Sequence, residues 1–172
     1  GKIGDVSCVK LLCNTVVASK DNAEQQAAVN SLHGLKGDKV NSTIVASMKS
    51  APAEAKVKLI EALVTRKATE SVGDLVAQAK GPDAKVRVAA LRALGWIAQP
   101  ADLETLVPLA VKPADDPARS AAEVAIVQVA RKIARESERG DTVLAALKTA
   151  GDTPARCSLI RVLGNLGGKK AF

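Results

Sequence analysis

The residue types that most often perform chemistry in proteins are scarce in this sequence. His33 is the single histidine among 172 residues, and the three cysteines, Cys8, Cys13 and Cys157, include no C-x-x-C pair. Metal and redox sites are usually built from such pairs or from clustered Cys and His, and a catalytic nucleophile needs a base beside it. We therefore expect no catalytic site, no metal and no cofactor. His33 is expected to be structural, and the cysteines to act as small buried side chains.

Charged residues offer a second kind of chemistry, which is the binding of anions. The chain has 25 Lys and Arg against 18 Asp and Glu, a net charge of +7, and such an excess can indicate a nucleic-acid partner. One basic series recurs at nearly regular spacing and could form a phosphate-binding ladder: Lys56, Arg87, Arg119 and Arg156.

Acids placed four residues before three of these arginines favour a structural interpretation of the series. These acids are Asp83, Asp115 and Asp152. Acid before base at this spacing stabilises a helix as an ion pair, and an aspartate at a helix N-terminus also caps it. We interpret the ladder as structural, and binding of a ligand is the alternative.

A second basic cluster closes the longest helix that the sequence predicts. It consists of Arg131, Lys132, Arg135 and Arg139, with Glu136 and Glu138 among them. We expect a solvated helix end that the helix dipole favours. The alternative is contact with an anion or a partner.

The elements that carry these residues repeat along the chain. One slot holds Asp21, Pro52, Asp83, Asp115 and Asp152, so the successive spacings are 31, 31, 32 and 37 residues. Eleven residues after it, an aliphatic slot holds Leu32, Leu63, Leu94, Ile126 and Leu163. Apolar residues follow helical spacing in each block and in a shorter segment between blocks, and Gly, Pro and Asp separate the two. The pattern predicts one repeat domain over 1–172, with helix-turn-helix units at about 5–36, 37–67, 68–98, 99–137 and 138–168.

The composition fits stacked helices with small side chains. Apolar residues make up 47% of the chain, but Trp96 and Phe172 are the only aromatics, so we expect a core of Ala, Val, Leu and Ile. No segment alternates like a β-strand, and no apolar run has the length of a membrane span. Residues 164–168, Gly-Asn-Leu-Gly-Gly, predict a helix stop. The chain begins with Gly close to a helical pattern, and we expect a segment of a longer protein, either cytoplasmic or exported with its signal removed.

Two segments resemble the helices of a HEAT repeat. Val86-Arg87-Val-Ala-Ala-Leu-Arg-Ala-Leu-Gly95 is similar to the second helix, and Leu106-Val107-Pro108-Leu109 to the proline-bearing first helix. The resemblance covers essentially the whole chain and is closest to the short bacterial repeats of the phycobilin-lyase type. It implies an all-α, right-handed α-solenoid of about five hairpins, with second helices along the concave face. It also implies Asp and Arg ladders between stacked repeats, and no particular activity.

The enzymes of the HEAT class have features that this sequence lacks. A single histidine cannot supply the paired His-Glu motifs of the di-iron HEAT hydroxylases. The HEAT-like DNA glycosylases use an aromatic-lined cleft, whereas this chain offers Trp96 alone, which we interpret as a packing or edge residue.

These arguments favour a non-enzymatic scaffold that binds a protein on its concave face. An exposed slot of mixed charge is predicted on that face and holds Asn30, Glu61, Arg92, Val124 and Arg161. Glu123 is anomalous because its slot is apolar in the other units; it either faces solvent, which we favour, or is a buried carboxylate with a partner, which would make it a site candidate. The binding candidates are therefore Arg92, Glu123, Val124, Arg131, Arg135 and Arg161. A nucleic-acid-binding solenoid and a spacer joined to a catalytic domain are the alternative functions; a membrane partner is not expected.

Overall fold

The computed structural model describes residues 6–37 and 39–167. These residues form ten α-helices and no strand, arranged as five hairpins in which a first helix is followed by a second. The first helices are α1 (Val6–Ala18), α3 (Val40–Met48), α5 (Val72–Ala79), α7 (Leu103–Val111) and α9 (Asp141–Thr149). The second helices are α2 (Asn22–Gly34), α4 (Ala53–Thr65), α6 (Ala84–Ile97), α8 (Asp116–Ala130) and α10 (Thr153–Leu166). Short 3₁₀ turns at Thr69–Ser71, Pro100–Asp102 and Glu136–Glu138 lie between hairpins.

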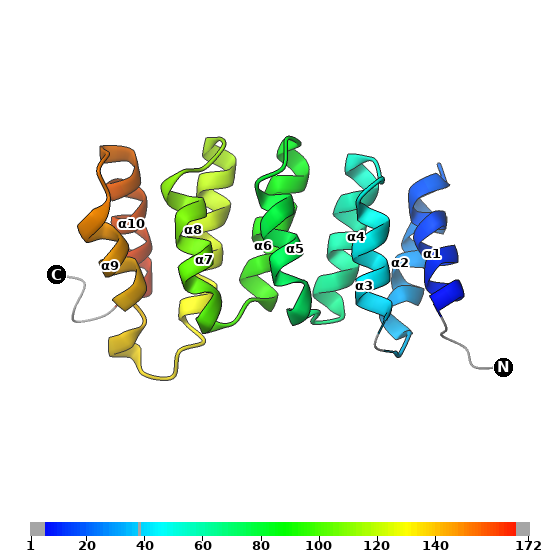
Figure 1. The fold of residues 1–172 in the computed structure, drawn as a ribbon, viewed down its shortest axis with the longest axis horizontal. Helices are drawn as coiled ribbons and strands as arrows, with labels where there is room; N and C mark the ends of the chain where they lie inside the picture. The colour runs from blue at the N-terminus through cyan, green and yellow to red at the C-terminus, as the bar shows by residue number, and fades with distance from the viewer. Residues whose placement is uncertain (1–5, 38, 168–172) are drawn as a thin grey trace.

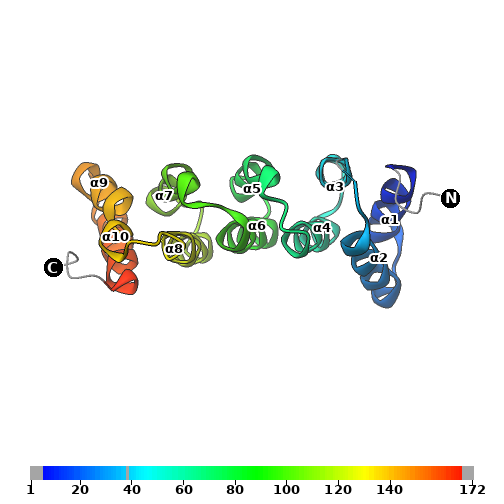
Figure 2. The same ribbon diagram turned by 90° about the horizontal axis from the view of Figure 1, so that it is seen from below.

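The hairpins stack side by side in chain order, with α1 and α2 at one end and α9 and α10 at the other (Figure 1). Seen along the helices, α3, α5 and α7 form one layer and α4, α6 and α8 the other (Figure 2). The terminal helices α2 and α10 reach beyond the second layer on its outer side (Figure 2). The outer side of the second-helix layer is therefore the hollow side of a shallow curve. This all-α stack confirms the predicted fold class.

The second helices begin at capping residues that the sequence identified. The carboxylates of Asp83, Asp115 and Asp152 each accept a hydrogen bond from the backbone N–H three residues later, at 3.0, 2.7 and 2.7 Å. Proline follows within the first turn of α8 and α10, where its missing N–H leaves no bond unmade. The predicted stop after α10 is also present, since Gly167 adopts a left-handed conformation with φ 63°.

Aliphatic side chains fill the space between the two layers. The repeating slot eleven residues after the cap is buried in all five hairpins, at Leu32, Leu63, Leu94, Ile126 and Leu163. The described core contains no aromatic ring, which confirms the predicted core of small aliphatic residues. Small residues let the stacked second helices approach closely. A Cβ added to Gly95 of α6 would lie 3.1 Å from the Cα of Ala125 in α8.

Two sequence expectations concern burial and the membrane. Cys13 is buried and burial raises the pKa of its thiol, but Cys8 is half-buried and Cys157 is exposed. The expectation of three buried cysteines is therefore wrong, because Cys157 lies on the outer side of α10. None of the helices in the described part of the chain is long and apolar enough to span a bilayer.

Candidate functional site

The outer side of the second-helix layer is built from residues spaced by one or two helical turns. On α6 these are Lys85, Arg92 and Trp96, all exposed, because they lie opposite the buried stripe that contains Leu94. The Trp96 side chain is 67% exposed, so it is an edge residue and not a packing residue. Arg92, one turn before Trp96, makes no hydrogen bond or ion pair with the described residues.

Val124 continues this surface onto α8. It occupies the same slot as Arg92 in the preceding hairpin and is 54% exposed. The five residues predicted for the exposed slot are all exposed: Asn30, Glu61, Arg92, Val124 and Arg161. Two exposed apolar side chains beside an unpaired cation form a surface that another protein could cover.

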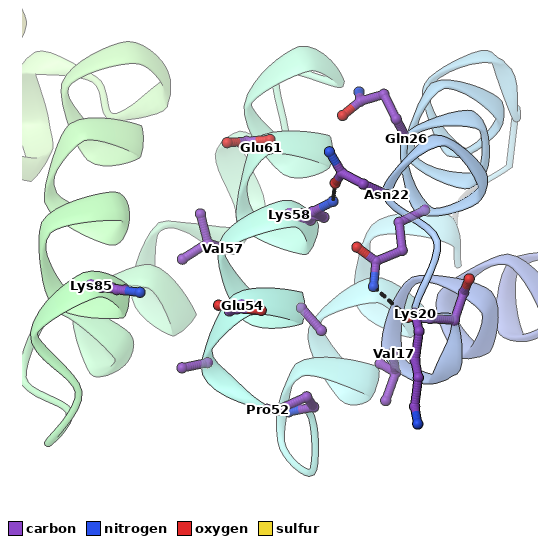
Figure 3. A pocket seen from close by; sticks show the side chains of 14 residues that line it. Val17, Lys20, Asn22, Gln26, Pro52, Glu54, Val57, Lys58, Glu61 and Lys85 are labelled. Atoms are coloured by element: carbon purple, nitrogen blue, oxygen red, sulfur yellow. Dashed lines mark hydrogen bonds between the residues drawn. The ribbon is translucent and has the colours of Figure 1, made fainter.

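A groove of about 960 Å³ lies between α2 and α4, at the N-terminal end of the stack. Figure 3 shows Glu54, Lys58 and Glu61 on α4 at one side, and Asn22 and Gln26 on α2 at the other. The Nζ of Lys58 donates to the Oδ1 of Asn22 across the groove. Helices α2 and α4 are therefore less closely packed than α6 and α8.

Charges of both signs line this groove. Lys20, Lys58 and Lys85 contribute amines, while Glu54 and Glu61 contribute carboxylates. Lys85 belongs to α6, so the groove approaches the surface that carries Arg92 and Trp96 (Figure 3). Alternating signs give local recognition of polar groups, but they do not form the continuous positive track that a polyanion requires.

Glu123 does not face solvent, so the expectation that it is exposed is wrong. Its side chain is only 12% exposed. The Nη2 of Arg161 donates to its Oε1 at 2.7 Å, the Nε of Arg161 to its Oε2 at 3.1 Å, and the buried Ser158 hydroxyl to Oε1 at 2.6 Å. All three donors come from the next hairpin, so Glu123 joins α8 to α10.

The electrostatics of Glu123 follow from this geometry. Burial raises the pKa of the Glu123 carboxyl, but the hydrogen bonds from Arg161 and Ser158 together lower it more, and the net pKa lies below its ordinary value. The carboxylate is thus held in its charged form by donors from α10. A carboxyl with a lowered pKa and three donors is poorly suited to general acid or base catalysis at neutral pH.

One rung of the Asp–Arg ladder expected between hairpins is found among the described residues. Arg87 pairs with Asp115 of the following hairpin, and not with Asp83 four residues before it. Its Nη1 also donates to the carbonyls of Gly81 and Pro82 at 2.9 and 2.7 Å. Arg119 reaches the Pro154 carbonyl of the next hairpin at 3.3 Å. Arg119 also pairs with Asp116 of its own helix at 3.7 Å, and Arg156 contacts the Leu147 carbonyl of its own hairpin. The expected pairs four residues apart are therefore wrong, because Arg87 and Arg119 reach the next hairpin and Arg156 turns to α9.

The basic cluster after α8 also has a different role from the one predicted. Helix α8 ends at Ala130, so these four cations lie beyond it. Their contacts are with backbone carbonyls and one acid: Arg131 with Asn165, Lys132 with Trp96 and Ala98, Arg139 with Ile133, and Arg135 with Glu138. Arg131 and Lys132 thereby cap the C-terminal ends of α10 and α6 on either side of α8.

Arg66 also caps the end of a helix in a neighbouring hairpin, and we did not predict this contact from the sequence. It follows α4, and its Nη1 donates to the carbonyls of Leu32 and Leu35 at 2.7 Å each, at the C-terminal end of α2. A cation just after a predicted helix is a signal for such a cap, but the sequence does not say which helix end it reaches. Lys20 and Lys85 of the groove were missed as well.

His33 and the side chains that can bind a metal are the remaining candidates for chemistry. His33 is exposed, and its carbonyl accepts a bond from Arg66 at 3.2 Å. No group of three or more His, Cys, Asp or Glu side chains is placed to hold a metal within residues 6–37 and 39–167. What the geometry supplies is an exposed surface and a polar groove, both of which are suited to binding.

A family model described as HEAT repeats matches residues 41–127. No curated protein matches the chain. Among solved structures, human deoxyhypusine hydroxylase in complex with glycerol is similar over 96% of this chain and 65% of its own, with 22% identity and a TM-score of 0.58. An engineered protein is similar over 92% of this chain and 78% of its own, with 19% identity and a TM-score of 0.49. The chain thus spans less than two thirds of the hydroxylase, and the likeness is one of fold. These matches do not single out the phycobilin-lyase type of repeat that the sequence suggested.

Proposed function

Since the chain belongs to the HEAT-repeat family, we propose that it is a non-catalytic scaffold whose second-helix face binds a protein partner. The binding surface consists of Arg92, Trp96 and Val124, continued by the groove between α2 and α4. The single observation that supports this proposal most is the exposure of Trp96, at 67%.

A large exposed ring is costly to leave in water and valuable to bury in an interface. Trp and Arg are the side chains that most often dominate binding energy, and here they stand one helical turn apart on α6. Arg92 makes no hydrogen bond or ion pair with the described residues that partner binding would have to break. Val124 widens the apolar part of the surface onto the next hairpin.

The groove indicates the chemistry of the rest of the partner. Its Lys and Glu side chains and the amides of Asn22 and Gln26 can pair with a peptide segment that carries both charges and polar backbone groups. A nucleic acid would meet Glu54 and Glu61 along the same groove, which opposes its phosphates. A protein segment is therefore the better match.

Selection from a random peptide library displayed on phage tests this proposal without requiring the natural partner. The chain is the bait, and the Kd of each selected peptide is then measured by biolayer interferometry. The test variants are Trp96→Ser and Val124→Asp. The matched control is Thr105→Asp, which places the same new charge on an exposed position of α7 in the other layer.

We expect the selected peptides to lose about tenfold or more in affinity on Trp96→Ser, and to bind the Thr105→Asp control like the wild type. The proposal is contradicted if peptides are not enriched relative to Trp96→Ser used as bait. DNA oligonucleotides are used in the same way to test the alternative function, nucleic-acid binding. Binding of oligonucleotides that exceeds peptide binding and weakens steeply with salt would favour the nucleic-acid function instead.

A further inference from the structure

The stacked second helices contact one another through the same slots in successive hairpins. On α6, these slots hold Arg87, Leu91 and Gly95, each four residues after the last. Arg87 pairs with Asp115 of the next hairpin, and Gly95 lies against Ala125 of α8. Leu91 between them is 2% exposed. An Arg, an aliphatic residue and a Gly therefore form the side of a second helix that faces the following hairpin.

Helix α10 has the same three residue types at the same spacing, and no following hairpin covers them among the described residues. They are Arg156, Ile160 and Gly164. Ile160 is 53% exposed, and a Cβ added to Gly164 would have no neighbour within 4 Å. Arg156 donates only to the Leu147 carbonyl of its own hairpin, at 3.4 Å. Helix α10 thus has the composition of an internal interface on this side.

The opposite end of the stack offers the complementary side. The surface that α8 turns toward α6 includes Asp115, with small residues six and ten positions later, at Ala121 and Ala125. In α2 the corresponding slots hold Asp21, Ala27 and Ser31, all exposed. The Ser31 hydroxyl already donates to the Ala27 carbonyl at 2.8 Å, so it can be covered without leaving an unpaired donor.

Both aspartates cap their helices with Oδ1, although Asp115 accepts from the N–H three residues later and Asp21 from the N–H two residues later. The Oδ1 of Asp115 caps α8 through the N–H of Ala118, and its Oδ2 accepts from Arg87. The Oδ1 of Asp21 caps α2 through the N–H of Ala23 at 2.8 Å, and no bond to its Oδ2 is found among the described residues. Asp21 therefore has one oxygen free where Asp115 receives an arginine.

We infer that the α10 end of one copy of this chain stacks on the α2 end of a second copy, in the register of the internal interfaces. Arg156 then pairs with Asp21, Gly164 lies at Ser31, and Ile160 is covered between them beside Ala27. The two surfaces lie at opposite ends of the molecule (Figure 1), so one chain cannot close this contact on itself. A head-to-tail contact of this kind is open-ended and can add further copies. It involves the ends of the stack and not the second-helix face, so it is independent of the proposed function.

Sedimentation equilibrium with variants that block one end at a time tests this inference. Ile160→Glu blocks the α10 end and Ala27→Arg blocks the α2 end. The matched control is Val124→Glu, because Val124 is 54% exposed, close to the 53% of Ile160, but lies on the second-helix face. Moderate salt is used so that the net charge of +7 does not keep copies apart. Far-UV circular dichroism verifies that each variant is folded.

We expect the weight-average mass of the wild type and of Val124→Glu to rise with concentration above the 17.7 kDa of one chain. Each blocked variant alone should stay at that mass, and their equimolar mixture should form a species of about twice the mass because one open pair of ends remains. The inference is overturned if the wild type stays monomeric at every concentration. It is also overturned if Val124→Glu prevents assembly as Ile160→Glu does, or if the mixture remains monomeric.

Discussion

Arg87 on α6 donates to the same carboxylate of Asp115 that caps the first turn of α8. The hydrogen bonds from Arg87 and from the N–H of Ala118 hold the pKa of Asp115 below its ordinary value. One side chain thus fixes the start of a helix and its distance from the preceding hairpin. Asp152 caps α10 in the same way, but no arginine among the described residues pairs with it.

The difference between these two aspartates predicts unequal effects of their removal. Asp115→Ala should lower the urea midpoint of unfolding more than Asp152→Ala, because it also leaves the buried Arg87 guanidinium without its acid. The measurement is urea denaturation followed by far-UV circular dichroism. Equal effects of the two substitutions would mean that the pair with Arg87 adds nothing to the cap.

Gly95 and Gly164 occupy equivalent slots of α6 and α10, but substitution by alanine should have opposite effects on stability. Gly95→Ala should destabilise the fold by about 1–3 kcal/mol, because its Cβ would overlap Gln128 and crowd Ala125. Gly164→Ala should stabilise it by about 0.5–1 kcal/mol, because alanine is the better helix former and meets no neighbour. Both free energies of unfolding are measured at a low concentration that excludes self-association. A gain in stability for Gly95→Ala would show that α8 moves away without cost.

Glu123 predicts a dependence of stability on acid pH. Its pKa in the folded chain is lowered, so its stabilising contribution is fully present above its ordinary pKa and is lost as the pH falls through the folded pKa. The difference in unfolding free energy between wild type and Glu123→Gln should therefore be constant near neutral pH and shrink below about pH 4.5. Thermal melts across this range measure it. A difference that stays constant down to strongly acid pH would exclude the charged bridge to Arg161.

An aspartate should destabilise the fold far more at Leu94, in the core, than at Arg92, on the surface of the same helix. Leu94 is fully buried, and loss of its side chain alone would cost about 2–5 kcal/mol, so Leu94→Asp should abolish the cooperative melt. Arg92→Asp introduces the same side chain at an exposed position and should change stability by about 0.5 kcal/mol or less. Circular dichroism melts compare the two. A melt of Leu94→Asp like that of the wild type would contradict the arrangement of α6.

The side chains that cap helix ends in the preceding hairpin should each affect hydrogen exchange in that one helix. Arg66→Met removes the donors that cover the end of α2 but keeps an apolar side chain, so amide hydrogen exchange should quicken several-fold in α2 and stay unchanged in α6. Lys132→Met should do the reverse, because Lys132 covers the end of α6. Exchange that quickens throughout the chain in both variants would indicate that the stack opens as one unit.

The repeat and its core could be predicted because they follow from spacing within one unit. A leucine or isoleucine eleven residues after a capping slot must lie on the buried stripe of its own helix, and Leu32, Leu63 and Leu94 all do. The caps at Asp83 and Asp152 were equally predictable, because a capping bond spans only three residues of the same chain segment.

The partners of the charged side chains could not be predicted, because they depend on how far one hairpin lies from the next. Arg87 has an acid four residues before it and another 28 residues after it, and only the stacking geometry decides between them. Glu123 interrupts an apolar slot, and its partner Arg161 lies 38 residues away. The groove between α2 and α4 depends on the placement of the first hairpin, which no pattern within one unit encodes.

The lone indole of this protein has an optical consequence. Trp96 is largely in water while the chain is folded, so its emission should already lie close to that of a hydrated indole. Intrinsic fluorescence would then change little when the core melts. The same emission should shift toward the blue when a protein covers Arg92 and Val124 beside it. The emission of Trp96 should thus report the binding of a partner to the second-helix face, but it should change little on unfolding.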